Sequence, residues 1–288
     1  MITTLVPVLH QAQLNRYAVG AFNTNNLEFS QAIIEAAHEE QAPVIIQLSP
    51  KAMVYGGKAL FCLTQELAAN TDVPVVIHLD HGRKLSDLKL GLEWQMSSVM
   101  MDASALSFKR NVDATKEAVR LAHRHRASVE GELGTIGGQE DYVTGDDQNS
   151  YSLDQIKIFA KETRVDALAL GLGTSHGLPV KNEHVDQNIL KQARAAVTTP
   201  LVLHGASNIA PLVIRKAILN GITKINIDTE LRQPFTGAVR HALATDHRLF
   251  DPREYLGVAR AAVKERVKQK IRLFGSANKA NYGYPRFR

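Results

Sequence analysis

Short apolar runs alternate along this chain with longer segments in which apolar positions recur about every 3.6 residues. The short runs are typical of buried strands, and the longer segments are typical of helices with one apolar face. The expected strands span residues 18–24, 43–49, 73–81, 97–103, 128–133, 167–173, 201–204 and 224–228. The expected helices span residues 27–40, 59–70, 112–125, 153–161, 188–196 and 211–219, with a weaker helical pattern over 85–95.

Eight strand–helix units in 288 residues predict an α/β protein, with a (β/α)8 TIM barrel as a single domain over residues 1–288. A doubly wound parallel sheet is the alternative, because it uses the same crossovers. The polar candidates favour the barrel, since a barrel gathers its active site at the C-terminal ends of its strands. The candidates lie near the C-terminal ends of six expected strands: Asp80, His81, Asp102, Glu130, Glu132, His176, His204 and Asp228.

Three segments fall outside the strand–helix repeat. Residues 137–151 form a polar loop containing glycines, whose length is typical of a mobile lid over an active site. Residues 252–275 are expected to add a basic C-terminal helical segment, with an apolar face that covers the barrel or a neighbouring subunit. Residues 279–288 are expected to form a frayed, flexible tail.

The composition narrows the function classes. With 34 basic and 29 acidic residues the net charge is +5, a mild excess that suits small anionic substrates such as sugar phosphates. No basic run contains interleaved aromatics, so nucleic acid is a poor candidate partner. The first ten residues lack the pattern of a signal peptide, and no apolar run approaches the ~18 residues of a membrane span. The single cysteine, Cys62, is expected to be buried in a helix, and the lack of a disulfide partner agrees with a reducing cytoplasm.

Residues 78–82, with the sequence His-Leu-Asp-His-Gly, follow the apolar run 73–77 of an expected buried strand and are the most informative stretch of the chain. Placing a carboxylate between imidazoles at the end of a strand is costly if it serves packing alone. His176 and His204 also follow expected strands, and each of them precedes a glycine, as His81 does. Three such histidines predict a zinc site with three protein ligands and an open fourth position, where the metal acts as a Lewis acid.

The last two expected strands end in residues 203–207, Leu-His-Gly-Ala-Ser, and residues 226–229, Asn-Ile-Asp-Thr. The loops after the last two strands of a barrel often hold a phosphate group. Backbone N–H groups near Gly205 and Ser207 are suited to cradle a phosphate, together with the hydroxyls of Ser207 and Thr229.

From about residue 20 to residue 279, the chain resembles the zinc-dependent (class II) fructose-bisphosphate and tagatose-bisphosphate aldolases. Each motif alone is weak, but together and in this order they are highly specific. The motifs are residues 21–28, 78–82, 98–102, 130–134, 137–141, 173–177, 204–207, 226–229 and 273–276.

The resemblance implies reversible cleavage of a ketose 1,6-bisphosphate into dihydroxyacetone phosphate and glyceraldehyde 3-phosphate, through a zinc-stabilised enediolate. It assigns zinc to His81, His176 and His204. It assigns proton transfer at the substrate C4 hydroxyl to Asp80, and proton exchange at the enediolate carbon to Glu140. It also implies a monovalent cation, Na⁺ or K⁺, near the phosphate, and a homodimer or homotetramer.

The resemblance further implies a set of substrate-binding residues. Most of them hold the dihydroxyacetone phosphate half of the substrate. Because the barrel's own loops hold only one of the two phosphates, the second phosphate needs a separate cation, and a guanidinium grips it best. In relatives of this length the matching arginine comes from a neighbouring subunit, which predicts that Arg260 binds the C6 phosphate in trans. The full set is Ser49, Gly177, Gly205, Ser207, Asn226, Asp228, Thr229 and Arg260.

Two acidic residues have alternative roles at this stage. Asp102 either orients a metal-binding histidine or caps the turn that follows it. Glu132 is either an alternative metal contact, a partner of a metal ligand, or a structural hydrogen-bonding residue.

The substrate and the reaction class also have alternatives. Asp228 favours fructose bisphosphate, because tagatose-cleaving relatives tend to have Ala at this position. A zinc hydrolase and a non-catalytic companion subunit are the competing functions. The first strand lacks the His-x-His pair common in such hydrolases, and no metal or acid–base position is lost. The chain departs from common family residues at Arg83, Lys84, Trp94 and Asn208, which bears on substrate preference and local packing.

Overall fold

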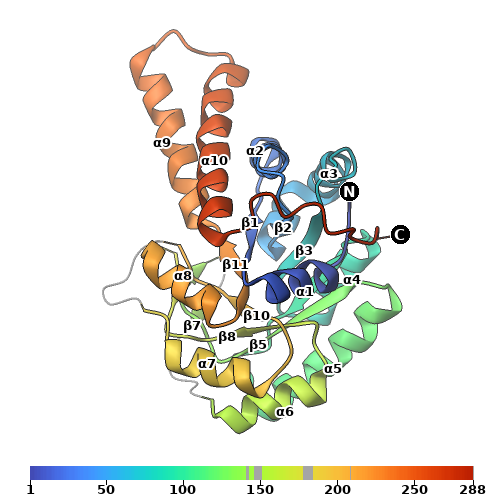
Figure 1. The fold of residues 1–288 in the computed structure, drawn as a ribbon. Helices are drawn as coiled ribbons and strands as arrows, with labels where there is room; N and C mark the ends of the chain where they lie inside the picture. Colours follow the sequence, from blue (N-terminus) through green and yellow to red (C-terminus); the bar gives the residue numbers. More distant parts are fainter. Residues whose placement is uncertain (141–142, 146–150, 178–183, 208, 288) are drawn as a thin grey trace.

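The computed structural model describes residues 1–140, 143–145, 151–177, 184–207 and 209–287 (Figure 1). Eight parallel strands close into a barrel in the order β1-β11-β10-β8-β5-β4-β3-β2. The closed order confirms the predicted TIM barrel and excludes the open, doubly wound sheet. The barrel strands are β1 (Val19–Asn23), β2 (Val44–Leu48), β3 (Val75–Gly82), β4 (Ser98–Met101), β5 (Ser128–Leu133), β8 (Ala167–Leu170), β10 (Leu201–Leu203) and β11 (Ile222–Ile227).

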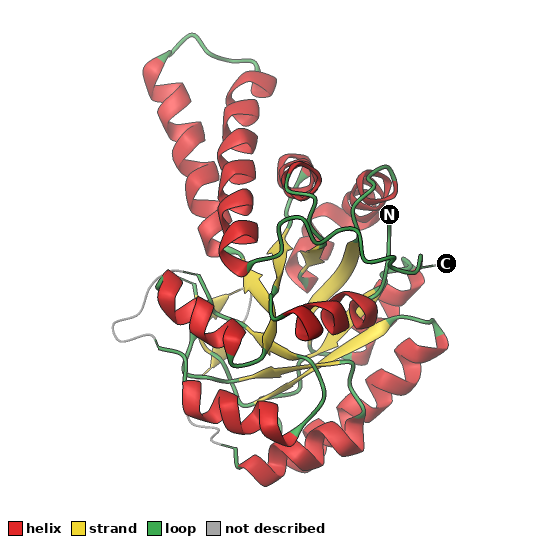
Figure 2. Ribbon diagram, viewed as in Figure 1, coloured by secondary structure: helices red, strands yellow, loops and turns green. Residues whose placement is uncertain are grey.

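Helices surround the barrel, as Figure 2 shows. Each turns an apolar face toward the strands; in α5, for example, Val112, Val119 and Ala122 are buried. The predicted boundaries hold within a few residues except in α3, which begins nine residues earlier than expected because it contains a kink at Gly57. These helices are α2 (Leu27–Glu39), α3 (Pro50–Ala69), α4 (Leu85–Glu93), α5 (Phe108–Arg124), α6 (Leu153–Thr163), α7 (Gln187–Ala196) and α8 (Pro211–Leu219).

Helix α1 (Leu5–Asn15) closes the N-terminal end of the barrel and was not predicted from the sequence. Its buried residues Leu5 and Leu9 belong to one apolar cluster with side chains of the barrel strands, including Val76 and Val202. The plugged end therefore contributes to stability, and the polar side chains gather at the opposite end of the strands.

Helices α9 (Thr229–Thr245) and α10 (Pro252–Phe274) form a hairpin that projects from the barrel (Figure 1). Helix α10 coincides with the predicted C-terminal helical segment and packs against α9 and α2. Helix α9 was not predicted, because its apolar face is sparse and Pro234 lies inside it. None of the helices in the described part of the chain is long and apolar enough to span a membrane.

The segment predicted as a polar loop contains two short strands where the structure describes it. β6 (Gly137–Glu140) pairs antiparallel with β7 (Val143–Gly145), and β6 also pairs in parallel with β9 (Ser175–His176). The expected polar loop therefore contains strands, because a polar sequence does not indicate that its backbone pairs with β9.

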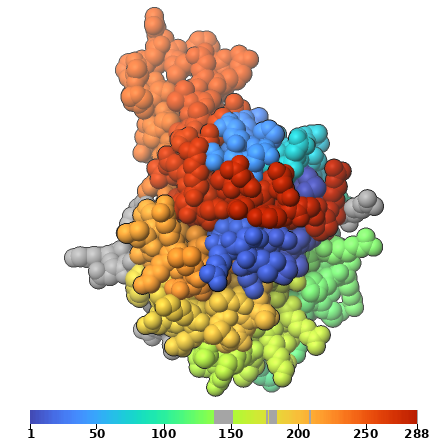
Figure 3. Space-filling model, viewed as in Figure 1, coloured from blue at the N-terminus to red at the C-terminus, as the bar shows by residue number. Residues whose placement is uncertain are grey.

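Two further expectations differ from the structure. The C-terminal tail, expected to be frayed, packs across the N-terminal end of the barrel beside α1 (Figure 3). There Tyr284 is buried, and the Phe287 N–H donates to the Ile2 carbonyl at 2.9 Å. Cys62, expected to be buried, is exposed on α3, which places its thiol on the solvent side of that helix.

Candidate functional site

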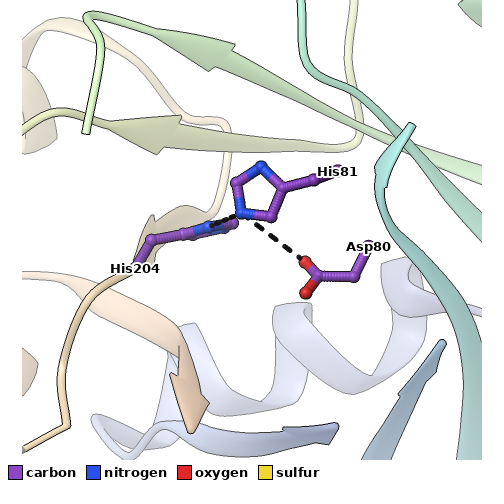
Figure 4. A group of neighbouring side chains, drawn as sticks. All are labelled: Asp80, His81 and His204. Atoms are coloured by element: carbon purple, nitrogen blue, oxygen red, sulfur yellow. Dashed lines mark hydrogen bonds and ion pairs between the residues drawn. The ribbon is translucent and has the colours of Figure 1, made fainter. Parts of the chain in front are cut away.

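Asp80, His81 and His204 come together at the C-terminal end of the barrel (Figure 4). One ligand atom from each of these buried side chains lies within 4.8 Å of the others. The backbone of His81 is left-handed, with φ of 51°, at a register shift between β3 and β4. An irregularity of this kind re-aims side chains at the end of a strand, so Asp80 and His81 both reach the site.

In each of the two histidines, one ring nitrogen contacts a buried carboxylate and the other faces the ring of the other histidine. His81 Nδ1 lies 3.0 Å from Asp102 Oδ2, and His204 Nε2 lies 2.8 Å from Glu130 Oε1. The remaining nitrogens, His81 Nε2 and His204 Nδ1, are 3.0 Å apart. Carboxylates that hold the far nitrogen are the usual partners of metal-binding histidines, so this donor set fits a zinc ion.

Asp102 makes the contacts that each of its two expected roles requires. One carboxylate oxygen holds His81, and the other accepts from the Ser104 hydroxyl at 2.7 Å and from the Ser104 N–H at 3.3 Å. Glu132 is also buried, with Oε2 3.9 Å from His81 Nδ1. Burial and the neighbouring Asp102 raise the pKa of Glu132 well above its ordinary value. The group formed by His81, Asp102 and Glu132 therefore places a second set of oxygen donors beside the histidine cluster.

The carboxylate of Asp80 is held by two amides. Asn23 Nδ2 donates to Oδ2 at 2.9 Å, and Asn226 Nδ2 donates to Oδ1 at 3.2 Å. Burial favours the protonated form, but His81, His204, Lys224 and the hydrogen bond from Asn23 outweigh it and lower the pKa of Asp80. The group is therefore an ionised carboxylate, which is able to accept a proton.

The two histidines of residues 78–82, His78 and His81, have different surroundings. Burial disfavours the charged form of His81, but Asp80, Asp102 and Glu132 outweigh it and raise its pKa to about 10. His78 is fully buried, and its Nδ1 lies 2.7 Å from the Ser98 hydroxyl. Burial, reinforced by Lys224, lowers the pKa of His78 well below its ordinary value, so His78 is a neutral interior neighbour of the site.

The candidate phosphate loops lie beside this cluster. Gly205 has a left-handed backbone, with φ of 59°, and Ser207 is buried. The Thr174 hydroxyl donates to the His204 carbonyl at 2.8 Å, which ties the loop after β8 to the loop after β10. Asp228 precedes Thr229, the first residue of α9, and its Oδ2 lies 2.5 Å from Arg232 Nη2. Gly177 also has a left-handed backbone, with φ of 95°.

Two predicted substrate residues lie outside the cluster. Ser49 immediately precedes α3, and its side chain caps the helix by accepting a hydrogen bond from the Ala52 N–H at 3.2 Å. Arg260 lies on α10, where it donates to Gln31 Oε1 at 2.8 Å and lies 3.8 Å from Glu35. Within the chain, the guanidinium of Arg260 is therefore held against α2.

The side chains of His176 and Glu140 lie outside the described residues, as does Asn208. The backbone of His176 is described: it pairs with Gly138 in the small sheet. A side-chain carbon added at Gly205 would lie 2.6 Å from the Ser175 carbonyl oxygen. The backbone just before His176 therefore lies directly against the loop that follows His204.

Asn23 and Lys224 were not predicted as residues of the site. Asn23 is the last residue of β1, and Lys224 is fully buried in β11, where it contacts Glu130 and Asn226. The signal for Lys224 was a lysine within an apolar strand. Because burying an unpaired ammonium group is very costly, such a lysine indicates a buried partner.

Comparison with known proteins gives a consistent result. A family model described as "Fructose-bisphosphate aldolase class-II" matches residues 3–279. A fructose-bisphosphate aldolase of Thermus caldophilus is 42% identical, and the match covers 97% of this chain and 100% of that protein. A fructose-bisphosphate aldolase of Staphylococcus epidermidis is also 42% identical, with 97% and 99% covered.

Solved structures agree with this match. The YdjI aldolase from Escherichia coli K12 superposes with a TM-score of 0.86 at 34% identity, covering 98% of this chain and 100% of its own. A putative fructose-1,6-biphosphate aldolase from Coccidioides immitis superposes with a TM-score of 0.89 at 25% identity, covering 97% and 99%. Sequence and fold therefore lead to the same group of proteins.

Proposed function

Because the chain belongs to the class-II fructose-bisphosphate aldolase family, we propose that it reversibly cleaves fructose 1,6-bisphosphate into dihydroxyacetone phosphate and glyceraldehyde 3-phosphate. The observation that carries the proposal is the convergence of His81 Nε2 and His204 Nδ1 beside the ionised Asp80. This arrangement offers a metal site and a proton acceptor at the same end of the barrel.

The proposed zinc ligands are His81, His176 and His204. Zinc, when bound, supplies a Lewis acid that stabilises the negative charge developing on the substrate oxygens. Asp102 and Glu130 hold the far nitrogens of His81 and His204, so both rings are oriented before any substrate arrives. A monovalent cation, Na⁺ or K⁺, near the phosphate is part of the proposal, as is a cytoplasmic location.

The proposed proton acceptor is Asp80. In the cleavage direction it takes the proton of the C4 hydroxyl, the electron pair of the C3–C4 bond stays on C3, and C4 leaves as the aldehyde carbon. The two amide donors from Asn23 and Asn226 keep the carboxylate ionised and oriented. Glu140 is the proposed residue for proton exchange at C3.

The proposed phosphate sites lie at two places. The dihydroxyacetone phosphate half is assigned to the end of β11 and to the segments that follow β8, β10 and β11. These contribute Gly177, Gly205, Ser207, Asn226, Asp228 and Thr229. The C6 phosphate is assigned to Arg260 of a neighbouring subunit in a homodimer or homotetramer, and Ser49 is a further proposed substrate-binding residue. Asp228 favours fructose over tagatose bisphosphate, and kinetics with both substrates side by side tests that preference.

The test of the proposed reaction combines metal analysis with a coupled assay of aldol cleavage. His81→Ala and His204→Ala should lower zinc content and cleavage together. Asp80→Ala should keep the zinc and lower cleavage by ~10²–10⁴, the scale of a positioned proton-transfer group. Full activity after exhaustive chelation, or loss of zinc in Asp80→Ala, would contradict the assignment. A zinc-dependent hydrolytic activity without aldol cleavage of the bisphosphate would favour a zinc hydrolase instead.

A further inference from the structure

A buried ion pair between Lys224 and Glu130 lies beside the cluster, and the proposed reaction gives a role only to Glu130, as the partner of His204. The side chains of Lys224 and Glu130 are fully buried, and Lys224 Nζ lies 3.0 Å from Glu130 Oε2. A buried ion pair is a poor source of stability, because the cost of removing both charges from water offsets their attraction. This pair is therefore better explained by a role in the neighbouring site than by a contribution to stability.

Lys224 fixes the direction of the Asn226 amide. Its Nζ donates to Asn226 Oδ1 at 2.6 Å, and an ammonium group has only donors. The oxygen end of the amide must therefore face Lys224, which leaves the NH₂ end directed at Asp80 Oδ1, 3.2 Å away. A reversed amide would place its oxygen against the carboxylate of Asp80 and its NH₂ group against the ammonium.

The second amide on Asp80 has no such constraint among the contacts that the structure gives. Asn23 accepts from Gln47 Nε2 at 2.8 Å while it donates to Asp80. Gln47 is itself an amide with a donor end and an acceptor end, so it tolerates either orientation of Asn23. Apart from the Asp80 carboxylate itself, Lys224 is thus the group in this network that imposes one direction on an amide, and the amide it fixes is that of Asn226.

We propose that Lys224 is a positioning residue, which holds the Asp80 carboxylate in the orientation that accepts the C4 proton by fixing the Asn226 amide. The proposal rests on the function proposed above for Asp80. Glu130 is the counter-ion, and its other oxygen binds His204 Nε2. The Lys224–Glu130 pair therefore joins the proton acceptor to a proposed metal ligand in one buried unit.

The test separates two reactions of the same site. Dihydroxyacetone phosphate has no C4 hydroxyl, so exchange of its carbon-bound proton with solvent does not need Asp80, whereas cleavage of the bisphosphate does. Lys224→Met alone leaves the buried charge of Glu130 without its ammonium counter-ion, so the variant used is Lys224→Met/Glu130→Gln. Cleavage should fall by about 10²-fold, the effect of a small misplacement of a reacting group, while exchange falls by a much smaller factor. Zinc content, measured on the same samples, should equal that of Glu130→Gln alone, because Glu130 also holds the proposed ligand His204.

Two control variants isolate the effect. Glu130→Gln alone keeps the Lys224 donor to Asn226, so its ratio of cleavage to exchange should match the parent's. Lys270→Met removes a buried lysine from a matched ion pair, Lys270–Glu230 at 2.6 Å, which lies between α10 and α9. That variant should have a lower Tm and an unchanged ratio of the two rates.

The outcomes are decisive when Asp80→Ala is measured alongside. Relative to Glu130→Gln, a parallel loss of both reactions in the Lys224→Met/Glu130→Gln variant, a loss of neither reaction, or a lower zinc content overturns the positioning role. If Asp80→Ala separates cleavage from exchange and the Lys224 variant does not, the positioning role alone is wrong. If Asp80→Ala fails to separate them, the proposed role of Asp80 is wrong, and the positioning role falls with it.

Discussion

Gly205 is a position where the site depends on the absence of a side chain. Its φ of 59° is strained for other residues, and an added Cβ would lie 2.6 Å from the oxygen and 2.8 Å from the carbon of the Ser175 carbonyl. Gly205→Ala should cost about 1–2 kcal/mol in backbone strain alone, and it should also displace the loop between His204 and Ser207. We expect a lower Tm and a raised KM for the bisphosphate, measured by thermal unfolding and steady-state kinetics.

Gly237 provides the matched control for that substitution. It lies in α9 with nothing within 4 Å of an added Cβ. Gly237→Ala should raise the free energy of unfolding by about 0.5–1 kcal/mol, because glycine is unfavourable inside a helix. Equal effects of the two substitutions on Tm would contradict the close approach at Gly205.

At the residue scale, the sequence predicted the reactive side chains but not the neighbouring side chains that orient them. His81, His204 and Asp80 stand out because reactive side chains rarely follow buried strands by chance. Their partners depend on barrel closure: Asn23 on β1 reaches Asp80 beside Asn226 on β11 because the first and last barrel strands pair. Pairing over that separation has no local signature in the sequence.

At the element scale, α10 is attached to α2 by a ladder of charges. Lys264 and Lys268 donate to the two oxygens of Glu39 at 2.9 and 2.7 Å, and Arg272 binds Glu40 at 2.7 Å. The basic residues recur at intervals of four along α10, so they lie on one face of the helix. The ladder explains how a projecting hairpin stays in register with the barrel.

Glu39 makes this contact sensitive to acid. Hydrogen bonds from Lys264 and Lys268 lower the pKa of Glu39 to about 2. A carboxylate with a lowered pKa stabilises the fold above its ordinary pKa of 4.5, and that contribution disappears as the pH falls toward 2. Glu39→Gln should therefore lower stability by up to about 1 kcal/mol at pH 7, and the difference from the parent should shrink below pH 4.5, as measured by urea unfolding. A difference that is independent of pH and of added salt would show that the ladder does not act through charge.

Elements with strong periodicity were predictable, and elements that depend on tertiary contacts were not. α8 has its expected ends, because a proline begins it and apolar positions recur along it. α1 and α9 have weak patterns and are stabilised by the end of the barrel and by α10. β6 and β7 lie in a polar segment, where only pairing with each other and with β9 creates strands.

At the scale of the whole molecule, the position of Arg260 tests whether the site is shared between subunits. On its own chain Arg260 is held by Gln31 and Glu35 of α2, away from the Asp80 cluster. If it binds the C6 phosphate of a neighbour, Arg260→Ala should raise the KM for the bisphosphate and barely affect binding of dihydroxyacetone phosphate.

Mixed oligomers decide between the two arrangements. Arg260→Ala subunits and Asp80→Ala subunits, each nearly inactive alone, should regain activity when they are combined, because a hybrid contains one intact shared site. Proven mixing of subunits without recovery of activity would place the action of Arg260 within its own chain, or exclude it from the reaction.

The two ends of the barrel differ in role: the candidate site lies at the C-terminal ends of the strands, and the opposite end stabilises the fold. The C-terminal tail packs at this opposite end. Tyr284 is buried in the cluster that contains Leu5 and Leu9 of α1, and its hydroxyl donates to the Lys279 carbonyl at 3.0 Å. Because these contacts lie at the opposite end from Asp80, Tyr284→Ala should lower the free energy of unfolding by about 3 kcal/mol, the usual cost of removing a buried aromatic ring. Tyr284→Phe, which loses only the hydroxyl, should cost about 1 kcal/mol. In both variants zinc content and kcat for cleavage should match the parent below the unfolding transition. A fall in kcat without a fall in Tm would mean that the two ends of the barrel are coupled.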